Sequence, residues 1–409
     1  MDKRSACVKC FVTLLAALGV VFSFTLGCDS GGSEKKIEPL SPLHWPQFRG
    51  PGGSAVTTGT APTSWNESTS TGIKWKTAVP LQGASSPVIC GNKAFLTGAD
   101  ATTREVYCFD ATTGELLWER QVVVSGSPTQ SNVFDGGSEN ITYAANSVAM
   151  DGKNVYAIFG NGDVAAFDHN GKALWSKNLG LPVNSWGHST SLLTHGSVVI
   201  VQIDMEAQWN TENAEWDSIS RLLALNGSTG AIVWEKLGAN RPVSWSLASP
   251  IVINAGGKDQ LITCSQGLYD GSTTAVGPDV FSYNPLTGAE YWRCKALGNS
   301  ASGMASSPVF VANRVVAIGA GFTVAIDPTG SGDVTATHIS WTAPYGSSEL
   351  CSPVGVGQDV FIMNGSMGRV DCLNMADGTS RWHQTFGESW ASPIIVGSNV
   401  YVLRLDGTM

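Results

Sequence analysis

The sequence is poor in charge. Only 14% of its 409 residues are Asp, Glu, Lys or Arg, and the formal net charge is -9. Binding to nucleic acid needs Lys and Arg clustered against phosphates, and the chain has no basic stripe. We therefore expect no nucleic-acid partner. The 47 glycines instead indicate many short strands and tight turns rather than helices.

The sequence also lacks the common catalytic signatures. Its six histidines form no H-x-x-x-H pair, and there is no G-x-S-x-G elbow and no phosphate loop. GNGD at 160–163 is typical of a hairpin turn rather than a nucleotide site. The acidic insert EAQWNTENAEWD at 206–217 does not have EF-hand spacing. We interpret it as a solvated loop, with a Ca²⁺ site as the alternative.

The N-terminus has the layout of an export signal. Three basic residues within 1–9 precede an uncharged apolar run at 11–27, which Cys28 follows. TLGC at 25–28 resembles a bacterial lipobox, although Thr25 stands where Leu is usual. We predict a signal peptide over 1–28 with lipidation of Cys28, and a polar, flexible tether over 29–44. The predicted location is extracytoplasmic, on the periplasmic side of the envelope and anchored by lipid, with plain secretion or an uncleaved anchor as alternatives.

One phrase recurs down the chain. FDATTGELLW at 109–118 places an Asp, a Gly and a Trp four residues apart, and related phrases follow at 167–175, 225–234, 283–292 and 373–382. A looser copy ends at residue 341. Repeats of 40–60 residues indicate stacked supersecondary units. A second phrase, SSPVI at 85–89, begins the units and returns at 248–252, 306–310, 351–355 and 391–395, with a degenerate copy at 189–193.

Each residue of the phrase has a physical role. Asp or Asn opens a turn by accepting backbone N–H bonds, and Gly supplies the positive φ that the turn needs. The Trp then lies on a strand and buries a large ring between units. Four strands per unit, repeated, make an all-β protein: a β-propeller of four-stranded antiparallel blades. The predicted structural docking residues are Trp75, Trp118, Trp175, Trp234, Trp292, Trp341 and Trp382.

The Asp/Asn-x-x-x-Gly-x-x-x-Trp pattern resembles the tryptophan-docking repeat of pyrroloquinoline-quinone-type propellers. That family includes quinoprotein dehydrogenases and the BamB-type lipoproteins of outer-membrane assembly. The resemblance covers residues 75–409, and WPQFRGPGG at 45–53 resembles the lead-in of such propellers. We therefore divide the body into a lead-in segment at 45–72, a loop that caps one face, and a propeller at 73–409.

The number of blades is open at this point. Seven tryptophans favour seven blades, whereas the resemblance to BamB-type proteins implies eight. The last unit begins at residue 391 and reaches residue 409 inside its third strand, so its blade is incomplete or the chain is truncated. We expect IKWKTAV at 73–79 to supply an outer strand that closes the ring and removes exposed edges.

The cysteines predict thiols rather than disulfides. The C-x-x-C at Cys7 and Cys10 lies in the segment expected to be cleaved. Six cysteines remain in the body, an even count that favours disulfides outside the cytoplasm. However, the pairs 90/108, 351/372 and 264/294 would each have a whole strand between their members, about 9.6 Å apart. That separation exceeds disulfide reach.

The resemblance does not extend to the dehydrogenases' chemistry. In those enzymes the quinone lies over the funnel, beside a pair of adjacent cysteines in the alcohol dehydrogenases, and a cation held by Glu, Asn and Asp activates it. This chain has no Cys-Cys dipeptide and no matching acidic set. We expect no catalytic residue, no metal and no cofactor, pyrroloquinoline quinone with Ca²⁺ included. A dehydrogenase with unrecognised ligands stays the alternative, so the enzyme question is open and leans towards none.

The connections before the first strands of the units would gather at one mouth of a propeller. The predicted rim residues there are Trp186, His188, Trp245, Met304, Glu349 and Trp390. Converging aromatic side chains suit a contact surface, and a simple plug of the channel is the alternative. We predict a non-enzymatic scaffold that binds envelope proteins, of which outer-membrane assembly is one form. A carbohydrate- or peptide-binding module is a further alternative, and the sequence identifies no small-molecule ligand.

Overall fold

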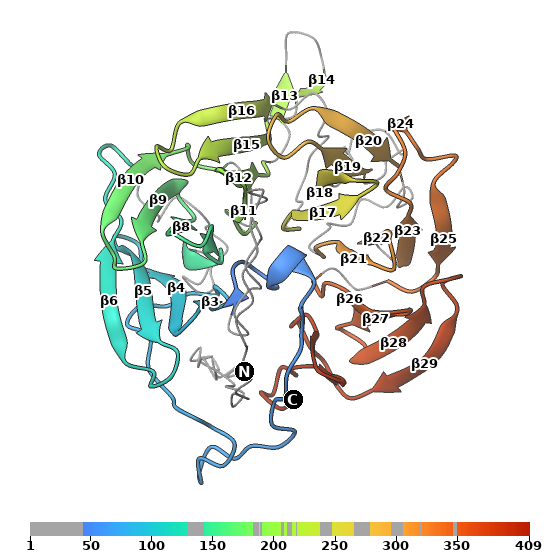
Figure 1. Cartoon of the computed structure of the whole chain (residues 1–409), viewed down its shortest axis with the longest axis horizontal. Helices are drawn as coiled ribbons and strands as arrows, with labels where there is room; N and C mark the ends of the chain where they lie inside the picture. Colours follow the sequence, from blue (N-terminus) through green and yellow to red (C-terminus); the bar gives the residue numbers. More distant parts are fainter. Residues whose placement is uncertain are drawn as a thin grey trace, which may run out of the picture.

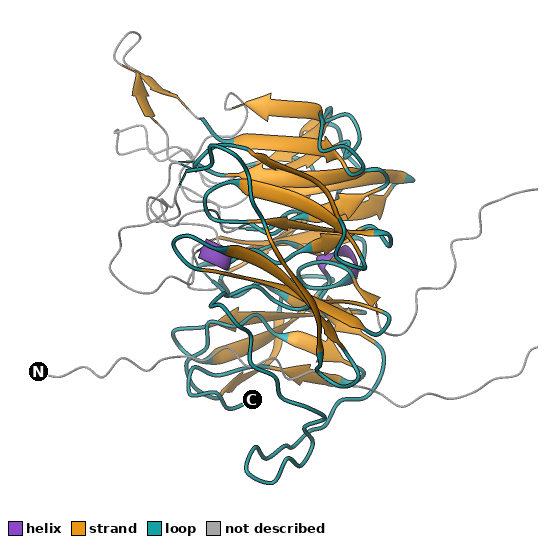
Figure 2. Cartoon of the chain, turned by 90° about the vertical axis from the view of Figure 1, so that its left-hand side faces the viewer, coloured by secondary structure: helices purple, strands orange, loops and turns teal. Residues whose placement is uncertain are grey.

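The computed structural model shows an all-β ring of sheets around one axis (Figure 1). It describes residues 44–128, 143–182, 188, 190–205, 208–210, 215–217, 219–237, 248–265, 279–295, 306–319, 321–346 and 350–409. The short 3-10 helix η1 (Pro51–Gly53) lies at the centre of the ring. Seen from the side, the ring is a flattened disc of twisted sheets (Figure 2).

Three four-stranded antiparallel units make up the first half of the ring. Each pairs its strands in the order inner, second, third and outer. The strands are β3 (Val88–Cys90), β4 (Lys93–Ala99), β5 (Arg104–Asp110) and β6 (Leu116–Gln121); β7 (Ala149–Met150), β8 (Asn154–Ile158), β9 (Asp163–Asp168) and β10 (Ala173–Asn178); and β11 (Leu193–His195), β12 (Val198–Ile203), β15 (Arg221–Asn226) and β16 (Ile232–Leu237).

Three more units follow with the same order. Their strands are β17 (Ile251–Ala255), β18 (Lys258–Ser265), β19 (Asp279–Tyr283) and β20 (Glu290–Cys294); β21 (Val309–Val311), β22 (Arg314–Gly319), β23 (Phe322–Ile326) and β25 (Ile339–Ala343); and β26 (Val354–Val356), β27 (Asp359–Asn364), β28 (Arg369–Asn374) and β29 (Ser380–Thr385). The predicted four-stranded antiparallel units are therefore confirmed.

The remaining strands are short. β1 (His44–Trp45) pairs with β3, and β24 (Gly332–Asp333) lies parallel to β20. β2 (Val56–Thr57), β30 (Ile394–Val396) and β31 (Asn399–Tyr401) form a three-stranded sheet at the end of the ring. The acidic insert contains a small hairpin, β13 (Gln208–Asn210) with β14 (Glu215–Asp217), which projects outward from the ring (Figures 1 and 2).

The hydrophobic core lies between neighbouring sheets. The second strands are apolar on both sides, as in β12, where all six residues are buried. Outer strands such as β6 instead bury one residue, Trp118, and expose the rest. Phe95 and Trp118 of the first unit share one buried cluster with Val148 and Val155 of the second. Because each sheet presents apolar side chains to the next, the ring is built from interfaces rather than from one central core.

The third and outer strands join through the turn that the sequence predicts. The Asp110 carboxylate accepts hydrogen bonds from the amides of Thr112 (2.7 Å) and Thr113 (2.9 Å), and Gly114 adopts a φ of 78°. Asn226 and Gly230 repeat the arrangement. The backbone N–H bonds also hold the pKa of the Asp110 carboxyl below its usual value, since they stabilise the charged form.

The expected closing strand at 73–79 is wrong as a strand. The segment has no strand pairing, although its Trp75 does dock on the first unit. Its ladder partner would be a third strand of the last sheet, and among the described residues that sheet stops at β31. The lead-in contacts the last sheet instead, because Val56 and Thr57 pair in parallel with Ile395 and Val396.

None of the six body cysteines is in a disulfide, as predicted. Cys90 and Cys108 lie on the inner and third strands of one unit, and Cys264 and Cys294 lie on second and outer strands. Cys351 lies three residues ahead of its inner strand rather than on it, which is a small correction. Burial raises the pKa of the Cys351 thiol to about 11 and of the Cys372 thiol to about 11.

Candidate functional site: the sealed axis and the docking tryptophans

A belt of serines links the units beside the axis. The amide of Ser86 donates to Ser147 Oγ at 2.9 Å, and the amide of Ser147 donates to Ser191 Oγ at 3.1 Å. The same bond from amide to hydroxyl, 2.9 Å long each time, links Ser191 to Ser249, Ser249 to Ser307, Ser307 to Ser352 and Ser352 to Ser392. These serines belong to the SSPVI-type phrase, so that phrase fixes each unit to the next as well as starting its inner strand.

The second unit also begins with this phrase, in the altered form ANSVAM. Ser147 takes the serine position there, and Val148 stands where five of the copies have Pro. Sequence comparison missed this copy because the Ser-Pro pair was its main signal. The serine belt identifies it by position.

The lead-in segment lies across the axis and not on one face as a cap. Its strand β1 pairs with β3, so that Trp45 lies opposite Ile89, and the Pro46 carbonyl accepts the Met150 amide at 2.9 Å. Further along, a Cβ on Gly53 would lie 2.5 Å from Ile251. The segment ends on the last sheet through β2. It therefore touches the inner strands of the first, second, fourth and last sheets, in agreement with the central place of η1 in Figure 1.

Arg49 anchors this segment. Its guanidinium donates to the carbonyl of Gly53 at 3.3 Å and to the carbonyl of Pro353, which directly precedes β26. The side chain is buried, and burial lowers its pKa to about 9, which leaves it charged at neutral pH. Arg49 also has a φ of 61°, a costly conformation for a residue with a side chain. We infer that these two carbonyls and the fold around them hold it there.

Most of the predicted rim lies outside the described residues. Trp186, Trp245, Met304 and Glu349 fall in ranges that the structure does not describe, so a ring of converging aromatic side chains stays a prediction. Two members are described. Trp390 is 66% exposed in the connection between β29 and β30, whereas His188 is buried.

His188 lies at the junction of the second and third units. Its Nδ1 is 2.9 Å from Nδ2 of Asn146, which also donates to the Thr190 carbonyl at 2.7 Å. Burial lowers the pKa of His188 to about 4, because the charged imidazolium loses its hydration there. The imidazole is therefore neutral at pH 7 and packs as part of the junction.

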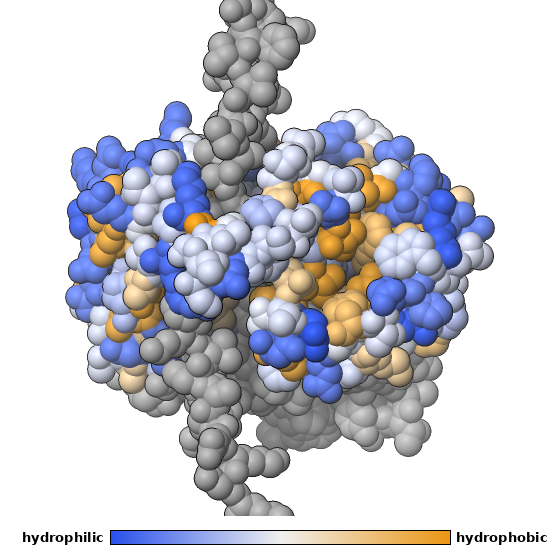
Figure 3. All heavy atoms as spheres, turned by 90° about the horizontal axis from the view of Figure 1, so that it is seen from below, coloured by the Kyte–Doolittle hydropathy of each residue, from blue (hydrophilic) through white to orange (hydrophobic). Residues whose placement is uncertain are grey.

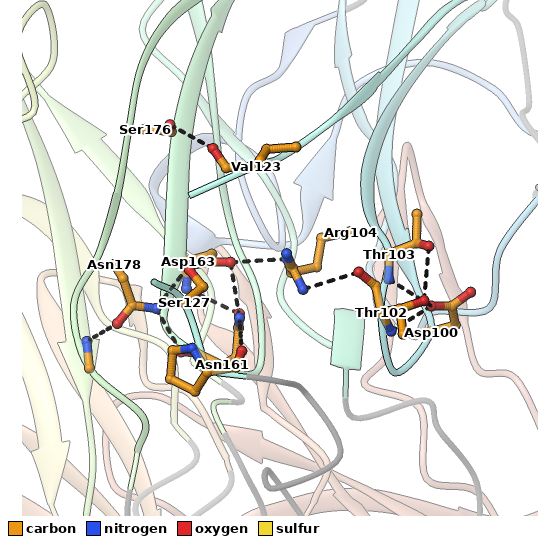
Figure 4. Close-up of polar contacts among 12 residues, drawn as sticks. Asp100, Thr102, Thr103, Arg104, Val123, Ser127, Asn161, Asp163, Ser176 and Asn178 are labelled. Atoms are coloured by element: carbon orange, nitrogen blue, oxygen red, sulfur yellow. Dashed lines mark hydrogen bonds and ion pairs between the residues drawn. The ribbon is translucent and has the colours of Figure 1, made fainter. Parts of the chain in front are cut away.

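A buried carboxylate occupies the junction of the first and second units (Figure 4). Asp163 of β9 lies 3.0 Å from Arg104 of β5 and accepts hydrogen bonds from Asn161 (2.9 Å) and Asn178 (2.8 Å). The Ser127 hydroxyl donates to it as well. Three hydrogen-bond donors and one ion pair thus surround its oxygens, which suits an inter-unit staple rather than an acid or base in catalysis. The GNGD turn predicted at 160–163 is confirmed, and it supplies two of these residues.

Five tryptophans dock in one way. Each indole covers the turn glycine of the next unit, and its Nε1 donates to a carbonyl of the same turn. In the clearest case a Cβ on Gly230 would lie 2.7 Å from the Trp175 ring, and Trp175 Nε1 bonds the Gly227 carbonyl at 2.8 Å. The other pairs of indole and glycine are Trp75 with Gly114, Trp118 with Gly171, Trp234 with Gly288 and Trp341 with Gly378.

A second donor, two residues after the tryptophan, often joins this contact. Thr77 Oγ1 bonds the Gly114 carbonyl at 2.7 Å, Arg120 Nε bonds the Gly171 carbonyl at 2.7 Å, and Lys177 Nζ bonds the Gly230 carbonyl at 2.9 Å. The sequence did not identify these residues, because their types differ. Their shared place two positions after each Trp was the available signal.

Two of the seven predicted docking tryptophans behave differently. Trp292 is fully buried, and its Nε1 donates to Gln260 of its own unit at 2.8 Å. The looser turn that follows it has a different shape, because Gly330 faces Val334 and His338 instead of an indole. Trp382 is 47% exposed, and among the described residues no turn glycine lies against it.

The described residues contain no group of three or more His, Cys, Asp or Glu placed to hold a metal. Over the same ranges, no helix is both long enough and apolar enough to cross a membrane. The side chains of the acidic insert are not described, so its predicted solvated state is untested.

The sequence and the fold of this chain are similar to those of known proteins. The family model described as "Outer membrane protein assembly factor BamB" matches residues 50–202 and 182–384. BamB from Moraxella catarrhalis has a similar structure, with a TM-score of 0.55 and 15% identity over 83% of this chain and 87% of that one. A europium-containing methanol dehydrogenase aligns over 90% of this chain and 88% of its own, with 11% identity and a TM-score of 0.47 that is too low to support an argument. No curated protein matches the sequence.

Proposed function

Because the chain belongs to the PQQ-like repeat family of outer membrane protein assembly factor BamB, we propose that it is a non-enzymatic propeller scaffold. In this proposal it works on the periplasmic side of the cell envelope and binds protein partners, with outer-membrane protein assembly as its setting. The family membership supports the setting, and the internal structure of the chain supports the absence of chemistry.

The observation that carries the proposal is the filled axis. The lead-in pairs with the inner strands β3 and β30, and Arg49 binds the Pro353 carbonyl just ahead of the inner strand β26. A propeller that works as an enzyme needs an open pocket with polar groups aimed at a ligand. Here η1 of the lead-in lies at the centre of the ring (Figure 1), which favours the loops and the outer edges as surfaces for partners.

The proposal includes seven blade positions. The serine belt has seven members, from Ser86 to Ser392, one at the start of each unit. The predicted docking tryptophans also number seven, from Trp75 to Trp382. In the other units, the tryptophan that docks on a turn comes from the outer strand of the preceding unit. Trp75 docks on the turn of the first unit in the same way, so the 73–79 segment takes the outer place of the last unit, and the two belong to one blade position.

We further propose that the chain reaches its site by export and lipid attachment at Cys28. The basic, apolar and lipobox-like order of residues 1–28 supports this, and these residues lie outside the described part of the structure. A tether over 29–44 would give the propeller reach from the membrane surface.

Photo-crosslinking from the predicted rim tests the proposal. A photoreactive phenylalanine derivative replaces Trp390, which is 66% exposed, and in a matched control it replaces Val233, which is 50% exposed on β16. We expect position 390 to crosslink to a defined component of the outer-membrane assembly machinery and position 233 to give none.

The competing reading is tested on the same purified protein. Its thermal unfolding is measured with and without pyrroloquinoline quinone and Ca²⁺, because a ligand at 100 times its Kd stabilises a fold by about 2.7 kcal/mol. A raised Tm together with no crosslink from position 390 would reject the scaffold in favour of a quinoprotein.

A further inference from the structure

The lead-in ties the first sheet of the ring to the last. Its strand β1 pairs with the inner strand β3, and its strand β2 pairs with the inner strand β30. Figure 3 views the ring from the side on which these two sheets meet, where an apolar hollow lies beside the last one. In the part of the chain that the structure describes, the inner strands between them, from β7 to β26, carry no strand on the edge that faces the axis. We call residues 44–57 the strap, because they connect the two ends of the series of sheets.

Few backbone bonds hold the strap in place. β1 and β2 contain two residues each, whereas strands inside a unit, such as β4 and β5, pair over seven. Carbonyl groups of the strap also accept the amides of Met150, Ile395 and Gly397, at 2.8 to 2.9 Å. So short an attachment can open while the longer ladders of the units stay intact.

The docked strap contains features that oppose docking. Arg49 and Ala55 have φ values of 61° and 55°, a costly conformation for residues other than glycine. The buried Arg49 guanidinium bonds two backbone carbonyls, and among the described residues its Nη1 has no hydrogen-bond partner. A buried charge is costly unless it is paired and fully hydrogen-bonded. Release would hydrate the guanidinium and relax both residues, so these features narrow the free-energy gap between the docked and the released strap.

We propose that the strap is a detachable gate on the axis of the ring, which closes the axis when docked and leaves it as one piece while the units stay folded. Apolar contacts set the docked position. The Trp45 ring lies over Gly50, Gly53 lies against Ile251, and Ala55 is fully buried. Release would remove η1 from the centre of the ring (Figure 1) and free the axis-facing edges of β3 and β30.

Release as one piece predicts a common behaviour in hydrogen exchange. The Met150 amide belongs to the second unit and the Ile395 and Gly397 amides to the last sheet, and the strap accepts all three. If the strap leaves as a unit, exchange resolved to single amides should give these three one free energy of opening. That value should be well below the one for β12, whose six residues are all buried and whose amides exchange on global unfolding.

A disulfide can hold the strap down. His44 and Cys90 are Cα partners in an antiparallel pair, and such partners lie about 4.5–5.5 Å apart, within the reach of a disulfide. In a His44→Cys variant, oxidation should join positions 44 and 90. Exchange of the Met150 amide should then slow by about tenfold or more relative to the reduced form. The reduced form is the matched control, because it carries the same substitution.

A second variant should loosen the strap. A Cβ on Gly53 would lie 2.5 Å from Ile251, so Gly53→Ala should speed the exchange of the Met150, Ile395 and Gly397 amides by one common factor, about tenfold or more. Gly52→Ala is the matched control and should speed it less, because a Cβ there has its nearest neighbour at 3.9 Å. The disulfide acts in the opposite direction, so it tests the same release if Gly53→Ala does not fold.

Three results would overturn the proposal. The three amides could show clearly different free energies of opening, they could exchange only together with the amides of β12, or oxidation of the His44→Cys variant could leave the Met150 amide unchanged. The scaffold function does not depend on these outcomes, since the partners proposed for it bind the loops and outer edges. Crosslinking from position 390 and exchange at the strap can therefore fail separately.

Discussion

Trp341 and Trp382 hold the same position in consecutive units, on β25 and β29, and their surroundings differ completely. Trp341 is 7% exposed, covers Gly378 and donates to the Met375 carbonyl at 2.8 Å. Trp382 is 47% exposed and contacts Phe361 of its own unit, with a ring separation of 5.8 Å. The difference shows that the tryptophan alone does not make an interface. The turn of the following unit completes it.

The largest expected effect tests that comparison directly. Trp341→Ala should lower the free energy of unfolding by about 3–5 kcal/mol, because it removes a buried ring and leaves a cavity against Gly378. Trp382→Ala should cost about 1 kcal/mol, since its ring is already half in solvent. Chemical denaturation of both variants measures the two losses. Similar losses would show that docking on the turn adds nothing to the burial within a unit.

Acid should weaken the junction of the second and third units, where His188 is buried. With a folded pKa of about 4 against 6.5 unfolded, His188 binds fewer protons in the folded state, so stability falls as pH decreases from 6.5 to 4. The loss reaches about 3 kcal/mol at the lower end.

A His188→Gln variant should lose this part of the acid dependence. The matched change His383→Gln, at an exposed residue of β29, should keep it. Denaturation at several pH values gives both profiles, and parallel profiles for His188→Gln and wild type would contradict the assignment.

Two adjacent glycines of the lead-in separate packing from backbone strain. Gly52 and Gly53 both have positive φ, 61° and 67°. A Cβ on Gly53 would lie 2.5 Å from Ile251, whereas on Gly52 its nearest neighbour is the Val252 carbonyl at 3.9 Å. We expect Gly53→Ala to destabilise by about 1–3 kcal/mol more than Gly52→Ala, from overpacking of the axis against the fourth unit. Equal Tm values for the two variants would show that the axis is loosely filled.

The smallest expected effect concerns the serine belt. Ser249→Ala leaves the buried amide of Ser191 without its acceptor and should cost roughly 1–2 kcal/mol. Ser86→Ala is the control, because Ser86 contributes its amide to the belt and no described amide donates to its hydroxyl. If thermal unfolding shifts equally in both variants, the hydroxyls do not hold the units together.

The sequence predicts local structure well where one turn contains all the information. The Asp110 to Gly114 turn and the strands beside it depend on neighbours within ten residues, and they are confirmed. The spacing from Asp to Gly failed to predict the turn at Gly330, because the insertion after Gly330 moves the positive φ to Gly332.

The axis could not be predicted in this way. Arg49 meets Pro353 across 304 positions of sequence, and no spacing rule reports such a contact. An arginine inside an apolar, glycine-rich phrase of a chain with little charge was the available signal. The 73–79 segment failed as a strand for a related reason, since a strand is defined by its partner and not by its own residues.

The serine belt is directional, and this has a consequence for how the ring opens. Every link runs from the amide of one unit to the hydroxyl of the next, so the belt is a linear chain with ends at residues 86 and 392. In such a one-dimensional array an interior unit is held by neighbours on both sides and a terminal unit by one. Local unfolding should therefore begin at the first and last units and travel inward, and amide exchange should slow progressively towards the units between them.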